Sequence, residues 1–234
     1  MSEQEEIIKI IETFFEIGKS KKPQPLRIFS SESSTINRLS TARIFLFGSR
    51  DIWVVVALPV LLDEELGWAD NGSGGFLAGW VIGYGIVQSW APSLLGLLGR
   101  TKETVQAAKI WALMLALTTI GIAIFVSAEI SVNAIVIGGL LIFGIIFAIN
   151  SSTHSFLILA YSKDEDTVAI NVGFYYAANA LGRLFGTLLS GLAYLVGGLD
   201  TALWVSAGFL VINWALTLTL PQTQSSAPST IASG

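Results

Sequence analysis

Near the middle of the chain, residues 107–126 read AAKIWALMLALTTIGIAIFV. The only charged residue in this stretch is Lys109, close to its start. A helix needs about 20 mostly apolar residues to cross the roughly 30 Å hydrocarbon core of a bilayer. Membrane β-barrel strands would instead show short segments of alternating hydrophobicity. The stretch therefore predicts a transmembrane helix.

Five further segments have the same character. The six predicted spans cover residues 42–62, 74–98, 107–126, 132–161, 167–196 and 201–220. The composition of the 234-residue chain agrees, since 53% of residues are hydrophobic and 13% are charged, whereas a soluble domain has about 25% charged residues. A disordered chain would need low hydrophobicity and high net charge. We therefore predict an all-α integral membrane protein with a six-transmembrane-helix bundle over residues 37–221.

The two ends of the chain are more polar. Residues 1–36 begin with an acidic stretch and then place isoleucines and phenylalanines at the spacing of an amphipathic helix, followed by a linker rich in serine and proline. This helix either packs on its own protein or lies on the membrane surface. Residues 222–234 predict a flexible tail.

Lysine and arginine predict the orientation, because they stay on the cytoplasmic side. They cluster before and at the start of the first span, in the second connection and at the entry of the third span, and in the fourth connection: Lys9, Lys19, Lys21, Lys22, Arg27, Arg38, Arg43, Arg100, Lys102, Lys109 and Lys163. The first, third and fifth connections have none. Both termini are therefore expected in the cytoplasm, with the protein multi-pass in the plasma (inner) membrane.

Several classes of partner are excluded by the composition. The chain has no cysteine and one histidine, so disulfides and thiolate chemistry are excluded. No cluster of histidine and carboxylate side chains has metal-ligand spacing, and no pair has the spacing of a hydrolytic nucleophile and base, so we expect neither a metal, a cofactor nor an enzyme. The net charge of −4 and the lack of a basic block argue against nucleic acid.

Charged residues inside the spans are the candidate functional residues, because a charge at the bilayer centre costs at least about 2.5–3.5 kcal/mol. Arg50 and Asp51 lie in the first span and Arg183 in the fifth. His154 interrupts the fourth span within the polar run at residues 150–155. Spans three and six have no deep charge and are expected to face lipid. This division predicts a three-plus-three arrangement, as in each half of the major facilitator fold.

The fifth span adds a polar arc. Asn171, Tyr175, Asn179 and Arg183 are four residues apart, and each step advances about 40° around a helix. The arc is interpreted either as one wall of a hydrated path or as an internal hydrogen-bond network that holds the bundle together.

The charges of this interior favour an anionic substrate. Two arginines, Arg50 and Arg183, and one aspartate, Asp51, give this interior a net charge of +1 when His154 is neutral. A guanidinium binds oxyanions in a bidentate manner. Asp51 is either the ion-pair partner of an arginine or the carrier of a coupling proton. His154 is a candidate for anion binding or proton coupling, or a plain hydrogen-bonding group.

Small residues and prolines predict packing features. Gly75, Gly79 and Gly83 in the second span, and Ala178, Gly182, Gly186 and Ser190 in the fifth, recur at every fourth position. Such stripes let helix backbones approach closely in membranes. Pro59 and Pro92 predict kinks.

Four motifs together resemble a known family. They are Gly48-Ser49-Arg50-Asp51-Ile52-Trp53 with Ala57-Leu58-Pro59-Val60, the glycine-rich segment from Gly75 to Gly85, Ser151-Ser152-Thr153-His154-Ser155 with the segment 157–161, and Asn171 to Ala180 continuing into Gly182-Arg183. In this order the chain resembles the ArsJ-type organoarsenical efflux permeases of the major facilitator superfamily, over about residues 37–221.

The resemblance implies export of 1-arseno-3-phosphoglycerate, which glyceraldehyde-3-phosphate dehydrogenase makes when it accepts arsenate, and hence arsenate resistance. It also implies twelve helices in two halves, of which this chain resembles the C-terminal half. A separate N-terminal six-helix half or self-association would then complete the transporter. The alternatives are export of another small organic or phosphorylated anion, and a non-transporting membrane remnant or assembly partner.

Overall fold

The computed structural model describes residues 33–68, 70–97, 101–162 and 165–222, all within the second of two compact units, Ser31–Gly234. The described elements are α2 (Ser34–Val54), α3 (Ala57–Val60), the π-helical turn η1 (Leu61–Glu65), α4 (Asp70–Leu97), α5 (Thr101–Ser127), α6 (Val132–Tyr161) and α7 (Glu165–Leu218). No strand occurs among these residues. The predicted all-α class is confirmed.

Four helical stretches are long and apolar enough to cross a membrane. Within the described part of the chain they are Ser34–Glu64, Thr104–Ser127, Val132–Tyr161 and Val168–Leu218. By helix length and composition, the chain therefore has the character of a membrane protein.

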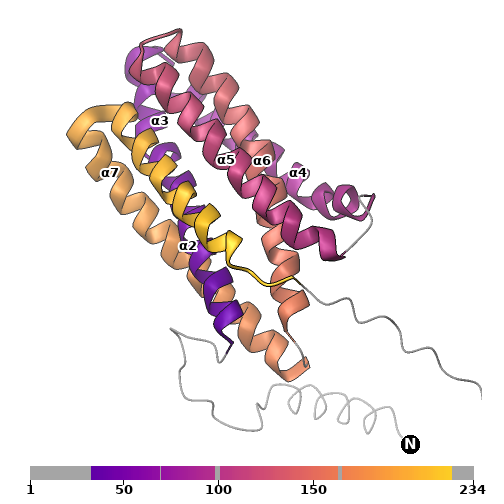
Figure 1. Cartoon of the computed structure of the whole chain (residues 1–234). Helices are drawn as coiled ribbons and strands as arrows, with labels where there is room; N and C mark the ends of the chain where they lie inside the picture. The colour runs from indigo at the N-terminus through magenta and orange to yellow at the C-terminus, as the bar shows by residue number, and fades with distance from the viewer. Residues whose placement is uncertain (1–32, 69, 98–100, 163–164, 223–234) are drawn as a thin grey trace, which may run out of the picture. The chain divides into compact units, whose positions relative to one another are not determined.

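The predicted count of six helices is not supported, because the described residues form five long helices. The predicted fifth and sixth spans belong to one element, α7. Gly197 (φ −165°, ψ 32°) and Gly198 (φ 65°, ψ −153°) leave helical geometry inside it. In Figure 1 the orange part of α7 and its yellow part run in opposite directions from this point. We call residues 165–196 the first arm of α7 and residues 199–218 its second arm.

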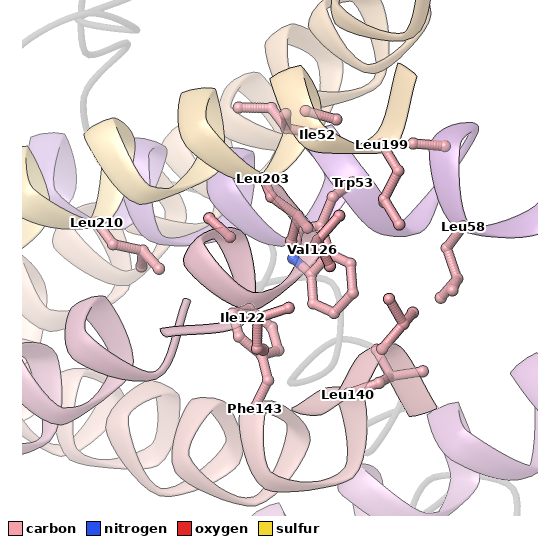
Figure 2. Packing of buried hydrophobic residues seen from close by; sticks show 14 of the residues in the cluster. Ile52, Trp53, Leu58, Ile122, Val126, Leu140, Phe143, Leu199, Leu203 and Leu210 are labelled. Carbon is pink, nitrogen blue, oxygen red and sulfur yellow. The ribbon is translucent and has the colours of Figure 1, made fainter. Parts of the chain in front are cut away.

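A large apolar cluster holds the bundle together. Helix α2 packs chiefly against α7, α5 packs against α6 and α7, and α4 packs against α6. Figure 2 shows side chains of this cluster from α2, α3, α5, α6 and α7 directed toward a common centre. Trp53 of α2 meets Phe143 of α6 edge to face, with ring centroids 5.3 Å apart. Edge-to-face contact of this kind adds about 0.5–1.5 kcal/mol to the burial of the rings.

A buried polar layer separates this cluster from a smaller one. The smaller cluster contains Ile36, Leu39, Val105, Ala108, Leu157, Ile158, Tyr175 and Leu220. On α6 the larger cluster ends at Phe147 and the smaller begins at Leu157, and the buried run from Asn150 to His154 lies between them. On α2, Arg43 lies in the same way between Leu39 and Leu46. Arg43 and the run from Asn150 to His154 thus form a polar layer between two apolar regions.

Pro59 explains the interruption of the first span. Proline lacks an N–H and its ring collides with the carbonyl four residues earlier, which is the carbonyl of Val55. Helix α2 ends at Val54 and α3 begins at Ala57. At the same interruption, the N–H of Val56 donates to the Ser190 hydroxyl of α7, at 3.1 Å. By contrast, α4 stays helical through Pro92.

The two predicted small-residue stripes differ in what they contact. A Cβ on Gly186 would lie 2.6 Å from the Gly48 carbonyl oxygen and 3.0 Å from Asp51 Cβ, and one on Gly182 would meet the backbone of Ile44. The stripe on the first arm of α7 therefore packs directly on α2, as predicted. Around Gly75, Gly79 and Gly83, by contrast, a Cβ would meet nothing within 4 Å. This face of α4 has no partner among the described residues.

The predicted N-terminal amphipathic helix and nearly all of the predicted C-terminal tail lie outside the described residues. Helix α2 begins at Ser34, and the Ser33 hydroxyl accepts from the Ile36 N–H at 3.5 Å. The division at residue 36 and the tail from residue 222 stay predictions.

Candidate functional site

Three of the predicted site residues meet at one carboxylate. Arg50 donates through Nε to Asp51 Oδ1 at 2.7 Å, and its Nη2 lies 2.6 Å from the same oxygen. Arg183, from the first arm of α7, donates through Nε to Asp51 Oδ2 at 3.2 Å. We call Arg50, Asp51 and Arg183 the central ion cluster. Asp51 is therefore an ion-pair partner of both arginines, and the cluster has a net charge of +1.

Arg50 is held by more than the ion pair. Its Nη1 donates to the Tyr84 hydroxyl of α4 at 3.1 Å, and its guanidinium carbon lies 5.2 Å from the Phe47 ring centroid and 5.3 Å from that of Phe147. Cation–π contacts contribute about 2 kcal/mol when the cation is desolvated. The Arg50 side chain thus joins α2 to α4 and α6 at a fixed position.

Arg183 has different surroundings. Its side chain is 60% exposed, whereas that of Asp51 is 3% exposed. Helical rise places Arg183 about 27 Å from the start of the first arm and about 20 Å from its end. One side of this guanidinium therefore binds the buried carboxylate while the other is open, at the middle of a membrane-length helix.

A second arginine of α2 is buried in the polar layer. Arg43 is 2% exposed, and its Nη1 donates to both the backbone oxygen and the hydroxyl of Ser151, each at 3.0 Å. Its guanidinium carbon lies 4.1 Å from the Phe47 ring centroid and 4.6 Å from that of Tyr175. Sequence reasoning placed Arg43 with the loop-proximal cations. Its spacing of seven residues from Arg50 is the signal for a shared face, because seven residues make almost two full helical turns.

His154 is fully buried in α6, and neither of its ring nitrogens has a hydrogen-bond partner. The Asn150 side chain, one turn earlier, is also fully buried with both of its polar atoms unpaired. Leaving a buried polar group without a partner costs about 1–3 kcal/mol. These two side chains therefore mark a place in the bundle where hydrogen-bonding capacity is unused.

The polar arc of α7 is divided among several neighbourhoods. Asn171 donates to the Ser162 hydroxyl at 3.1 Å, next to the end of α6. Tyr175 is buried with its ring against Arg43. Asn179 is half-buried and its Oδ1 has no hydrogen-bond partner. Only Arg183 reaches the central ion cluster. The arc therefore runs along α7 from the α6–α7 connection to Asp51, and its members contact different partners on the way.

No metal site is evident in the part of the chain that the structure describes. No three or more histidine, cysteine, aspartate or glutamate side chains gather there. The carboxylate of Asp51 is already bound by two guanidinium groups, and this arrangement repels a cation while leaving donors for an anion.

Comparison of the chain with protein-family models gives no match, and comparison with curated proteins gives none either. The resemblance to arsenical permeases therefore stays a prediction from the sequence motifs.

Proposed function

We propose that this chain is one half of a membrane transporter of the major facilitator type, and that it exports a small oxyanion-bearing substrate. The two arms of α7 would each cross the membrane, and α2, α5 and α6 would add three crossings. Helix α4, the predicted second span, is not among the four stretches apolar enough to cross, but in this proposal it is the sixth crossing. The change of direction at Gly197 and Gly198 supports this count. The distribution of lysine and arginine supports a location in the plasma (inner) membrane with both termini in the cytoplasm.

The open side of Arg183 is the observation that carries the proposal. A charged side chain at this depth does not face lipid; it faces a bundle interior, a water-filled cavity or a partner. The other side of the same guanidinium is held by a buried carboxylate. Because the carboxylate already fixes the Arg183 guanidinium, its open side can bind a solute in a hydrated path without a further loss of side-chain freedom.

The charge of the central ion cluster sets the class of substrate. Two guanidinium groups share one carboxylate, so each keeps donors for a second acceptor. Phosphate-like oxyanions fit the planar fork of arginine. With the resemblance to ArsJ-type permeases, this supports 1-arseno-3-phosphoglycerate as the exported anion, a functional link to glyceraldehyde-3-phosphate dehydrogenase, and arsenate resistance as the outcome.

A second half completes the path in this proposal. The glycine face of α4 meets nothing within 4 Å at Gly75, Gly79 and Gly83, and close backbone approach at such a face is typical of helix pairs in membranes. In facilitators the substrate lies between two six-helix halves. The missing wall would come from a separate N-terminal half or from a second copy of this chain.

The test is cellular arsenic retention under arsenate challenge. The host lacks its own arsenic exporters and expresses an arsenate-accepting glyceraldehyde-3-phosphate dehydrogenase. The chain is expressed alone and with a matching N-terminal half. We expect lower retention with the pair, and loss of that effect in Arg50→Ala and in Arg183→Ala with membrane insertion unchanged.

The matched control is Arg38→Ala, because Arg38 is exposed and donates to the backbone oxygen of Thr219, at 3.3 Å, away from the central ion cluster. It should export as the parent does. Full export by Arg50→Ala or Arg183→Ala would remove the assigned role. Unchanged retention in every arm, with the protein in the membrane, would favour another phosphorylated or organic anion, or a non-transporting remnant.

A further inference from the structure

The polar layer contains a buried cation that has no carboxylate partner. Among the described residues, the Asp51 carboxylate is bound by Arg50 and Arg183, and no ion pair joins a carboxylate to Arg43. Its Nη1 donates to two neutral oxygens of Ser151, and its Nε has no hydrogen-bond partner. A buried charge is costly unless it is both paired and hydrogen-bonded. The rings of Phe47 and Tyr175 offset only part of that cost.

Unused hydrogen-bonding groups lie on α6 within three residues of Ser151, the residue that binds this cation. Asn150 and His154 are four residues apart on α6 and therefore share a face, and Ser151, which binds Arg43, is the neighbour of Asn150. Asn150 and His154 are both completely buried, and the polar atoms of their side chains have no hydrogen-bond partner. An oxyanion needs such a set of donors: a planar guanidinium, an amide and an imidazole N–H.

Arg43 and Arg50 lie on one face of α2. The helical rise over seven residues separates their backbones by about 10 Å. The Phe47 ring stands between the two guanidinium groups, 4.1 Å from that of Arg43 and 5.2 Å from that of Arg50. The interior therefore has two positive centres along one line, divided by an aromatic ring.

We propose that Arg43, Asn150 and His154 form a second oxyanion-binding subsite, which takes one anionic end of a substrate whose other end lies at the central ion cluster. The substrate class is then a small molecule with an oxyanion group at each end. This reading of the substrate rests on the proposed export function. Access requires α2 and α6 to separate, and α2 makes most of its contacts with α7 and few with α6.

His154 provides the test, because it is the only histidine in the sequence. The full chain, carrying a histidine-free affinity tag and labelled with ¹⁵N-histidine, is reconstituted in lipid nanodiscs and titrated with inorganic phosphate. We expect a saturable shift of the His154 ring-nitrogen signals, which sodium chloride at equal ionic strength does not produce. Arg183→Gln should keep this shift, because it alters only the central ion cluster.

Arg43→Gln should weaken the phosphate affinity about tenfold or more, since a hydrogen bond to a charged group is lost. Arg43→Lys keeps the charge without the planar fork, so its phosphate affinity should lie between that of the parent chain and that of Arg43→Gln. If Arg43→Gln does not fold, the lysine variant alone provides the comparison with the parent chain. The subsite would be overturned if phosphate did not move the His154 signals of the parent chain. It would also be overturned if phosphate moved these signals with the same affinity in the parent chain and in both Arg43 variants. Export that depends on Arg50 and Arg183 without any His154 response removes the subsite alone, whereas a His154 response without export removes the export proposal alone.

Discussion

Arg50 and Arg183 bind the same carboxylate from different surroundings, so replacing them should affect stability differently. Arg50 is buried and also contacts Tyr84, Phe47 and Phe147. We expect Arg50→Gln to lower the free energy of unfolding by about 3–5 kcal/mol, as for a broken buried ion pair. Arg183→Gln should cost about 1 kcal/mol or less, because its guanidinium is largely exposed.

Reversible unfolding in mixed micelles, followed by tryptophan fluorescence, measures both losses. Because both arginines are assigned to the substrate, export should fall in both variants although their stabilities differ. Equal losses of stability would contradict the different surroundings of the two side chains.

At the same scale, the sequence predicts the ionic residues well and their neighbours poorly. Depth in the spans identified Arg50, Asp51 and Arg183, and the structure joins them although Arg183 is 132 positions from Asp51. Arg43 was classified by its nearness to a span end, which carries no information on the face it occupies. Asn171 was predicted from helical spacing alone, and its partner Ser162 depends on how the chain turns between α6 and α7.

Among the elements, the contact between α2 and the first arm of α7 depends on glycine. A Cβ on Gly186 would come within 2.9 Å of the Gly48 Cα, and backbone cannot move aside as a flexible side chain does. We expect Gly186→Ala to destabilise the bundle by about 1–3 kcal/mol, the usual cost of overpacking.

Gly191→Ala is the matched control on the same helix, because a Cβ there meets nothing within 4 Å. Alanine favours a helix over glycine, so this variant should be as stable as the parent or slightly more so. Thermal unfolding in detergent compares the two. A Gly186→Ala variant as stable as Gly191→Ala would mean that the two helices lie farther apart than the structure has them.

Element bounds were predictable where composition changes abruptly. The predicted fourth span, residues 132–161, coincides with α6, because polar residues flank both of its ends. The predicted first span begins eight residues late, since the start of α2 contains Thr35, Asn37 and Arg38, which give no apolar signal. The separate fifth and sixth spans were predicted from their apolar composition, and the structure has one element with a non-helical point at Gly197 and Gly198.

For the molecule as a whole, the question is which face meets water. Thr187 is exposed and lies one turn beyond Arg183 on the first arm of α7. Ile142 is 54% exposed on α6, where only apolar neighbours share its face. Since the chain has no cysteine, a single introduced cysteine reports on its own position. In a lipid bilayer, Thr187→Cys should react with a charged methanethiosulfonate at least about tenfold faster than Ile142→Cys, because the reactive thiolate requires a polar environment.

The reaction rates are measured by mass spectrometry on chain reconstituted alone and together with an N-terminal half. Slow reaction at both cysteines would place Arg183 in a dry, hydrogen-bonded network and remove the hydrated path. The sequence alone leaves this open, because the spacing of a polar arc is the same whether it borders water or another helix.

The interruption of the first span at Val55 and Val56 has a mechanical consequence. An unbroken helix transmits a tilt along its full length, but here Pro59 provides no N–H for the Val55 carbonyl, and the Val56 N–H donates to the Ser190 hydroxyl of another helix. A hydroxyl rotates freely about its C–O bond and can follow a small change of angle. Two residues outside regular helix thus join the segment bearing Arg43 and Arg50 to Leu58, which lies in the apolar cluster, so any change of angle between these two parts would be concentrated at Val55 and Val56.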